Sequence, residues 1–252
     1  MASYLIEFRF QSKKIRSYLK GMIWEVNRKF HVGRRKHVPH ITLVGPIATA
    51  NEQQLISDFN RICSQTPLMK FKGSGFGTFD SKRVVFVKII PGKNLDNFRR
   101  ELYHVLKGYC RLSEFDHEGD QADFGYHSTL VMNLGRREFE TIKEYIKNKT
   151  PPEFGQIVMR VTLLKNGRIL REYDFLQRRM LNRSQALNHR ISRRSKMLLK
   201  QFMQGQYNPN QVLSRQEKKD YYRREAYVKN VHQEKESKNE SIFTKIRKII
   251  GW

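Results

Sequence analysis

Two short strings of this chain share one pattern of residues that can do chemistry. HITL, beginning at His40, and HSTL, beginning at His127, each place a histidine two residues before a threonine. Threonine and the apolar residues around it suit a β-strand, and alternate side chains of a strand point to the same face. Two such strands side by side would present two imidazoles and two hydroxyls, a set that can hold a phosphate and move protons on both sides of it.

The repetition is what gives the pattern weight. A single histidine on a strand is more often a packing residue than a catalytic one. This chain, however, has only nine threonines and eight histidines, and two of each fall in the same H-x-T-L arrangement. One histidine can act as a base and the other as an acid near neutral pH. Thr42 and Thr129 can donate hydrogen bonds to phosphate oxygens.

The pair of motifs resembles the signature of the 2H phosphoesterase superfamily, whose members carry two H-x-T/S-x motifs. Within it the chain is most similar to the RNA 2′,3′-cyclic phosphodiesterases, also called the 2′-5′ RNA ligase family. The stretch FKGSGFGTFDSKRVVFVKII, from Phe71 to Ile90, resembles that family's glycine-rich hairpin and the apolar strand after it. The resemblance covers about residues 1–178.

The resemblance implies an α+β, bilobal fold with two antiparallel sheets and outer helices around a central groove. It also implies metal-independent hydrolysis of a terminal 2′,3′-cyclic phosphate of RNA to a 2′-phosphate, without a cofactor. His40 would be the proton donor and His127 the acceptor, with Thr42 and Thr129 beside them in catalysis and substrate binding. Tyr126 is a further candidate for substrate binding, because an aromatic ring can stack on a base.

Two other functions remain open on the residues alone. The same groove can run the reverse reaction and join RNA ends through a 2′,5′ bond. It can also hold a nucleotide or an RNA end without turnover, as a binding module.

The hydrophobic pattern predicts the elements that position the motifs. We expect strands at 4–10, 40–44, 68–77, 83–90, 126–132, 155–164 and 168–175, and helices at 12–30, 53–63, 95–109 and 138–148. Each half then has a motif strand, a helix and a hairpin in that order. An internal duplication of this kind would bring the two motif strands side by side about a pseudo-twofold axis.

The composition changes near residue 180, which divides the chain into a catalytic domain at 1–178 and a basic extension at 179–252. Residues 180–252 carry 17 Lys and Arg against 6 Asp and Glu. We expect a basic helix at 184–202, a break at 208–210 and a second helix at 214–228, which opens with a capping box. A partly disordered extension is the alternative.

The net charge of +25 and the isoelectric point near 10.2 favour an anionic partner. We expect the extension to bind the RNA backbone, with Tyr221, Tyr222 and Tyr227 stacking on bases or packing in a core. The amphipathic piece at 241–252 can instead lie on an anionic membrane surface. No apolar run is long enough to span a bilayer, so stable membrane insertion is not expected.

The remaining candidate sites are weaker. Cys63 and Cys110 have neither a disulfide pattern nor metal-ligand spacing, which predicts free thiols and a cytoplasmic protein. The string DHE, from Asp116, is a poor metal site because adjacent residues cannot easily face one ion. No helix follows the glycines at 73–77, so a turn or bulge is expected there rather than a phosphate cradle. The basic turn at 31–37 can contact phosphate or remain solvated. The oligomeric state stays open.

Overall fold

The structure is a computed structural model that describes residues 2–32, 38–114, 116 and 124–212. Residues up to Asn210 form one compact unit, and a second unit begins at Gln211. The predictions for 31–37, for Asp116-His117-Glu118, for 214–228 and for 241–252 therefore lie wholly or largely outside the described residues. The same holds for Tyr221, Tyr222 and Tyr227.

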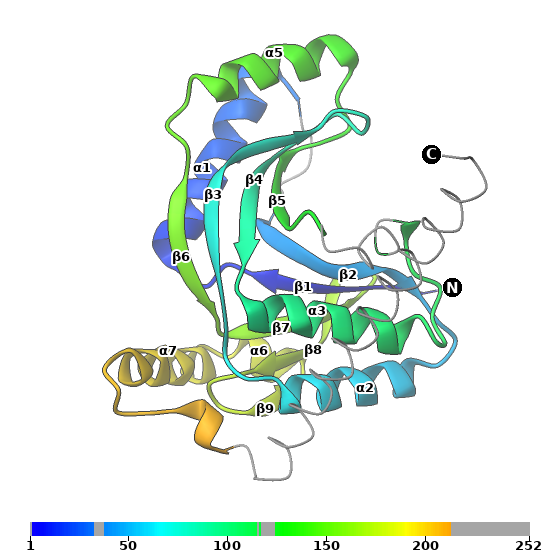
Figure 1. Cartoon of the computed structure of the whole chain (residues 1–252), viewed down its shortest axis with the longest axis vertical. Helices are drawn as coiled ribbons and strands as arrows, with labels where there is room; N and C mark the ends of the chain where they lie inside the picture. Colours follow the sequence, from blue (N-terminus) through cyan, green and yellow to red (C-terminus); the bar gives the residue numbers. More distant parts are fainter. Residues whose placement is uncertain (1, 33–37, 115, 117–123, 213–252) are drawn as a thin grey trace, which may run out of the picture. The chain divides into compact units, whose positions relative to one another are not determined.

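Two antiparallel sheets form the centre of the first unit (Figure 1). The first sheet has the strand order β2 (His40–Ala48), β1 (Ser3–Arg9), β7 (Arg160–Lys165), β8 (Arg168–Asp174) and β9 (Arg179–Leu181). The second sheet has the order β5 (His127–Val131), β4 (Val84–Pro91), β3 (Met69–Phe79) and β6 (Glu153–Val158). This confirms the predicted α+β fold with two antiparallel sheets.

Helices pack on both sheets. They are α1 (Lys13–Phe30), α2 (Glu52–Gln65), α3 (Lys93–Leu106), α5 (Arg136–Lys147), α6 (Arg183–Leu187) and α7 (His189–Met203), followed by a 3₁₀ turn at Pro209–Val212. Contacts join α1 and α5 to the second sheet. Helix α2 contacts α3 and β8 of the first sheet, and α3 contacts strands of both sheets, namely β2, β3 and β4. Figure 1 shows α1 and α5 on the same side of β3 and β4.

Helix α1 shows how closely local sequence decides these elements. Ser12 caps its first turn by accepting a hydrogen bond from the backbone N–H of Ile15, at 3.4 Å. Its buried residues recur at helical spacing, as the sequence predicts. They are Leu19, Met22, Ile23 and Val26.

An aromatic cluster links the two sheets. Phe8 of β1 and Phe71 of β3 meet edge to face, with ring centroids 5.1 Å apart. Phe10, which follows β1, meets Phe154 of β6 in the same way at 6.0 Å. Edge-to-face contacts of this kind add about 0.5–1.5 kcal/mol each beyond burial, so the cluster helps to hold one sheet against the other.

The segment 155–164 differs from the expectation of a single strand. It is two strands that join different sheets: β6 pairs with β3, and β7 pairs with β1 and β8. Met159 lies between them, and its carbonyl accepts the backbone N–H of Phe175 at 2.9 Å. No glycine or proline marks the change of sheet, so the sequence pattern carries no sign of it.

Residues 179–210, which the sequence places in the basic extension, belong to the compact unit. The expected helix at 184–202 is two helices, because the side chain of Asn188 caps α7 and ends the helical run of α6. A buried polar network joins α7 to the first sheet. Ser195 donates to Asp174 and accepts from Arg160 at 2.8 Å, and Arg160 also bonds Glu172 at 2.9 Å.

Within the described ranges, no helix combines the length and the apolar character that crossing a membrane requires.

Candidate active site

Both motif strands lie at the edge of their sheets. Strand β2 pairs with β1 on one side only, and β5 pairs with β4 on one side only. The two strands belong to different sheets, yet they contact each other. This agrees with the expectation that the motif strands lie side by side.

The strands alternate as the sequence predicts. Along β2, His40 and Thr42 are half-buried while Ile41 and Leu43 are fully buried. Along β5, His127 and Thr129 are half-buried while Ser128 and Leu130 are buried. Each histidine therefore shares one accessible face with its threonine.

The two imidazoles are oriented by the same kind of hydrogen bond. Nδ1 of His40 lies 2.8 Å from the carbonyl oxygen of Val38, and Nδ1 of His127 lies 2.7 Å from that of Gly125. A carbonyl oxygen only accepts, so Nδ1 carries the proton in both rings. Nε2 of each ring is then the atom that can accept or deliver a proton in catalysis.

His127 lies against two phenyl rings. Its ring centroid is 4.9 Å from that of Phe79 and 5.1 Å from that of Phe86. Burial lowers the pKa of His127, and the positive charges of His40 and Lys82 lower it further, against the hydrogen bond to Gly125, which raises it. The surroundings favour a neutral His127.

His40 has charged neighbours instead. Strand β1 pairs with β2 so that Arg9 stands opposite His40 and Glu7 stands opposite Thr42. One carboxylate oxygen of Glu7 lies 3.8 Å from Nε2 of His40, and Glu7 also binds Nε of Arg9. Glu7 is almost fully buried, with 3% exposed. The buried carboxylate gives His40 an anionic neighbour that His127 lacks among the described residues.

Sequence reasoning did not select Glu7 or Arg9. The available signal was their alternation with the apolar Ile6 and Phe8 in β1, which places two charged side chains on the face opposite the core. Which strand would lie beside that face depends on sheet order, which the sequence pattern does not specify.

Tyr126 is buried, in contrast to its expected role in binding substrate. Its side chain is only 4% exposed, and its hydroxyl donates to Asp96 at 3.2 Å. As the residue immediately before His127, it points to the opposite face. Phe8 is likewise in the core, with 1% exposed.

A buried arginine, Arg99, holds the backbone of the first motif strand. Nε of Arg99 donates to the carbonyl of Leu43 at 3.3 Å, and its guanidinium lies 3.7 Å from a carboxylate oxygen of Asp116. Asp116 in turn accepts the backbone N–H of Gly45 at 3.0 Å. Arg99 is fully buried, and burial lowers its pKa. The pair fixes the backbone just beyond Thr42.

Among the described residues, no group of three His, Cys, Asp or Glu side chains is arranged to hold a metal ion. Cys63 and Cys110 are free thiols, and burial raises the pKa of both.

One family model matches this chain, and several solved structures are similar to it. The family model of the 2′-5′ RNA ligase superfamily matches residues 11–169. A crystal structure of a phosphoesterase is similar, with 17% identity over 71% of this chain and 92% of its own, at a TM-score of 0.44. E. coli LigT complexed with 3′-AMP shows 17% identity over 71% and 91% of the two chains, at a TM-score of 0.42.

Kluyveromyces marxianus Usb1 shows 13% identity over 67% of this chain and 95% of its own, at a TM-score of 0.39. No curated protein matches significantly. The assignment therefore rests on the family model, which covers well over half of the chain and includes both motif strands. The family indicates a phosphodiesterase or hydrolase acting on RNA or nucleotide phosphates. On this evidence the chain belongs to the 2′-5′ RNA ligase superfamily of 2H phosphoesterases.

Proposed function

We propose that this protein is a metal-independent RNA 2′,3′-cyclic phosphodiesterase that opens the terminal ring to a 2′-phosphate. The observation that carries the proposal is the matched pair of imidazoles. Each is fixed through Nδ1 by the carbonyl two residues earlier, so that Nε2 is left for proton transfer. Two histidines in opposite protonation states on either side of one phosphorus are what ring opening requires.

The unlike surroundings of the two histidines support an assignment of roles. His127, whose pKa burial lowers, is the general base. It takes a proton from a water through Nε2 as the water oxygen attacks phosphorus. The bond from phosphorus to the 3′ oxygen breaks, and His40 delivers a proton to that oxygen. The product is a 2′-phosphate with a free 3′ hydroxyl. The carboxylate of Glu7, 3.8 Å from Nε2 of His40, suits a proton donor, because it stabilises a nearby positive charge.

Thr42 and Thr129 complete the site in this proposal. Each shares the accessible face of its strand with a histidine. Their hydroxyls would donate to the two non-bridging oxygens of the phosphate, where negative charge grows as the water attacks. We leave Tyr126 out of the site because its ring is buried.

Hydrolysis of a cyclic mononucleotide and of an oligonucleotide ending in a 2′,3′-cyclic phosphate, each with and without EDTA, tests the proposal. Equal formation of the 2′-phosphate in both conditions is expected, because the two histidines need no metal for the proton transfers. Turnover that EDTA abolishes would contradict it. Binding without any product would instead identify a nucleotide-binding module, and joined ends would identify a 2′,5′ ligase.

We also propose a cytoplasmic location. The two free cysteines are compatible with a reducing compartment.

A further inference from the structure

The sheet face that carries His127 continues into a row of lysines. Strand β4 places Lys88 directly opposite His127. Two residues further along the same face of β4 is Ile90, which stands opposite Lys72 of β3. Lys70 follows Lys72 on that face. We call Lys88, Lys72 and Lys70 the lysine row.

These lysines are exposed and lack acidic partners among the described residues. All three are exposed, and no ion pair within the described ranges includes them. Other lysines of the same unit are paired, for example Lys143 with Asp80 and Lys149 with Glu25. The lysine row is thus a strip of positive charge that the neighbouring fold does not neutralise.

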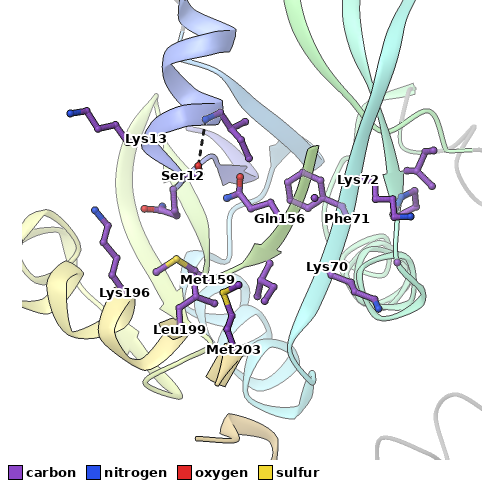
Figure 2. A pocket seen from close by; sticks show the side chains of 17 residues that line it. Ser12, Lys13, Lys70, Phe71, Lys72, Gln156, Met159, Lys196, Leu199 and Met203 are labelled. Atoms are coloured by element: carbon purple, nitrogen blue, oxygen red, sulfur yellow. Dashed lines mark hydrogen bonds between the residues drawn. The ribbon is translucent and has the colours of Figure 1, made fainter. Parts of the chain in front are cut away.

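The surface beside the lysine row is apolar and open. Ile90 is 52% exposed, so its side chain is accessible to a ligand. Gly155 of β6 stands opposite Lys72 and adds no side chain. Lys70, Lys72, Ile90 and Ile157 belong to the lining of an open cavity of about 820 Å³. Figure 2 shows Lys70 and Lys72 leaving β3 together, with Lys13 and Lys196 on the far side of Gln156.

We propose that the lysine row is the path of the RNA strand that leads to the reactive end. Lysine ammonium groups at successive positions would bind successive phosphates of a single strand, and Ile90 would support a base between them. This inference rests on the proposed function, because a terminal cyclic phosphate at His127 leaves the rest of the RNA on its 5′ side. The row begins beside His127 and leads away from it. An RNA whose backbone is bound along the row would therefore have its terminal cyclic phosphate at His127.

The geometry separates this path from the catalytic site. Strand β3 lies two strand spacings, about 10 Å, from β5. A mononucleotide held at His127 therefore has no need of Lys70 and Lys72, whereas a longer RNA must cross them. The substrate class that follows is a single-stranded RNA end of several nucleotides.

The test compares two substrates with one double variant in the full-length protein. Lys70→Gln with Lys72→Gln removes two positive charges from exposed positions. For a cyclic-phosphate oligonucleotide of six nucleotides, KM is expected to rise about tenfold at physiological salt, with kcat unchanged. The slope of log KM against log salt should become shallower by about 1.4, since two phosphate contacts are lost. Kinetics on the cyclic mononucleotide should not change.

Lys14→Gln with Lys20→Gln is the matched control, because both lysines are exposed on α1 and the charge change is the same. It should leave both substrates unaffected. An unchanged oligonucleotide KM in the Lys70 and Lys72 variant would overturn the path. An equal loss on the mononucleotide would also overturn it, by showing an effect on the site itself.

Failure of the proposed function has a separate signature, which is a wild-type protein that turns over neither substrate. The path is then measured by fluorescence anisotropy with a labelled oligonucleotide that ends in a 2′-phosphate. Tighter binding by the wild type than by the double variant supports the path, and equal binding overturns it. Weaker binding of vesicles of anionic lipid by the variant, with RNA binding unchanged, would assign the lysines to a membrane and overturn the path.

Discussion

His40 and His127 are held by equivalent hydrogen bonds, although they belong to different sheets. In each ring the Nδ1–H donates to the carbonyl oxygen two residues earlier, at 2.8 and 2.7 Å. The bond fixes the tautomer as well as the ring orientation, and so it defines Nε2 as the reactive atom in both. What differs is the neighbourhood, which is aromatic around His127 and charged around His40.

Replacing either histidine should abolish most of the activity. His40→Ala and His127→Ala are each expected to lower kcat on a cyclic mononucleotide by at least about two orders of magnitude, the usual scale for one positioned acid or base. Both rings are half-buried, and each belongs to the first residue of a strand at the edge of its sheet. The circular dichroism spectrum and the unfolding midpoint should therefore change little. His189→Ala, at an exposed position of α7, is the control. Near-normal turnover by either motif variant would remove the two-histidine mechanism.

The acidic limb of the pH profile should report His127. The base must be neutral, so kcat/KM rises as the pH passes upward through its pKa. Burial lowers that pKa below the ordinary value of 6.5, which places the limb below pH 6.5. A second limb at higher pH is expected where the acid loses its proton, and both apparent values belong to the pair.

Phe79→Ala tests the cause of that shift. Removing the ring admits water to His127, which relieves the burial and raises its pKa. The acidic limb should therefore move to higher pH. Phe30→Ala removes a ring that packs on Tyr145, with the ring centroids 5.2 Å apart, and should leave the limb in place. A limb that stays fixed in Phe79→Ala would mean that another group controls it.

The buried Arg99 should matter for stability much more than the residue beside it. Arg99→Met leaves Asp116 buried without its charge partner, which typically costs about 3–5 kcal/mol in the free energy of unfolding. Arg100→Met breaks a pair with Asp96 in which both side chains are about one quarter exposed, and pairs near the surface contribute about 0–1 kcal/mol. Urea denaturation measures both. Equal losses would contradict the anchoring role of Arg99.

The basic segment beyond Asn210 should add affinity for RNA without adding chemistry. Residues 211–252 carry 11 Lys and Arg against 6 Asp and Glu. A chain ending at Asn210 keeps the whole compact unit, including α7, and is a cleaner truncation than one ending near residue 179. It should hydrolyse a cyclic mononucleotide as the full chain does, and bind a long RNA more weakly with a shallower salt dependence. Unchanged RNA affinity would refute the role of this segment, and a loss of liposome binding alone would favour the membrane interpretation.

Local features of this fold were predictable from the sequence because they depend on near neighbours. The cap at Ser12, the apolar face with Leu19 and Val26, and the shared face of His40 and Thr42 all follow from one or two helical turns or from one strand repeat. The change from one sheet to the other at Met159 could not be predicted from the sequence, because alternation indicates the face on which a side chain lies and not the strand that pairs with it.

The surroundings of the histidines could not be predicted either, because they also depend on which strands pair. Glu7 reaches His40 across 33 positions of sequence, through the pairing of β1 with β2. The docking of α7 depends on Arg160 and Ser195, which meet across 35 positions. A basic composition alone gave no sign that this part of the extension belongs to the compact unit.

The most direct test of the central claim is an NMR titration of both histidines with and without a nucleoside 2′-phosphate. If Nε2 of His40 and of His127 face one phosphate, the anion stabilises the charged form of both rings. The pKa of each, followed through its ring Cε1 proton and assigned with the His40→Ala and His127→Ala variants, should then rise together on saturation with the ligand. A pKa that rises for one histidine while the other stays unchanged would contradict a shared phosphate, and with it the mechanism proposed for this protein.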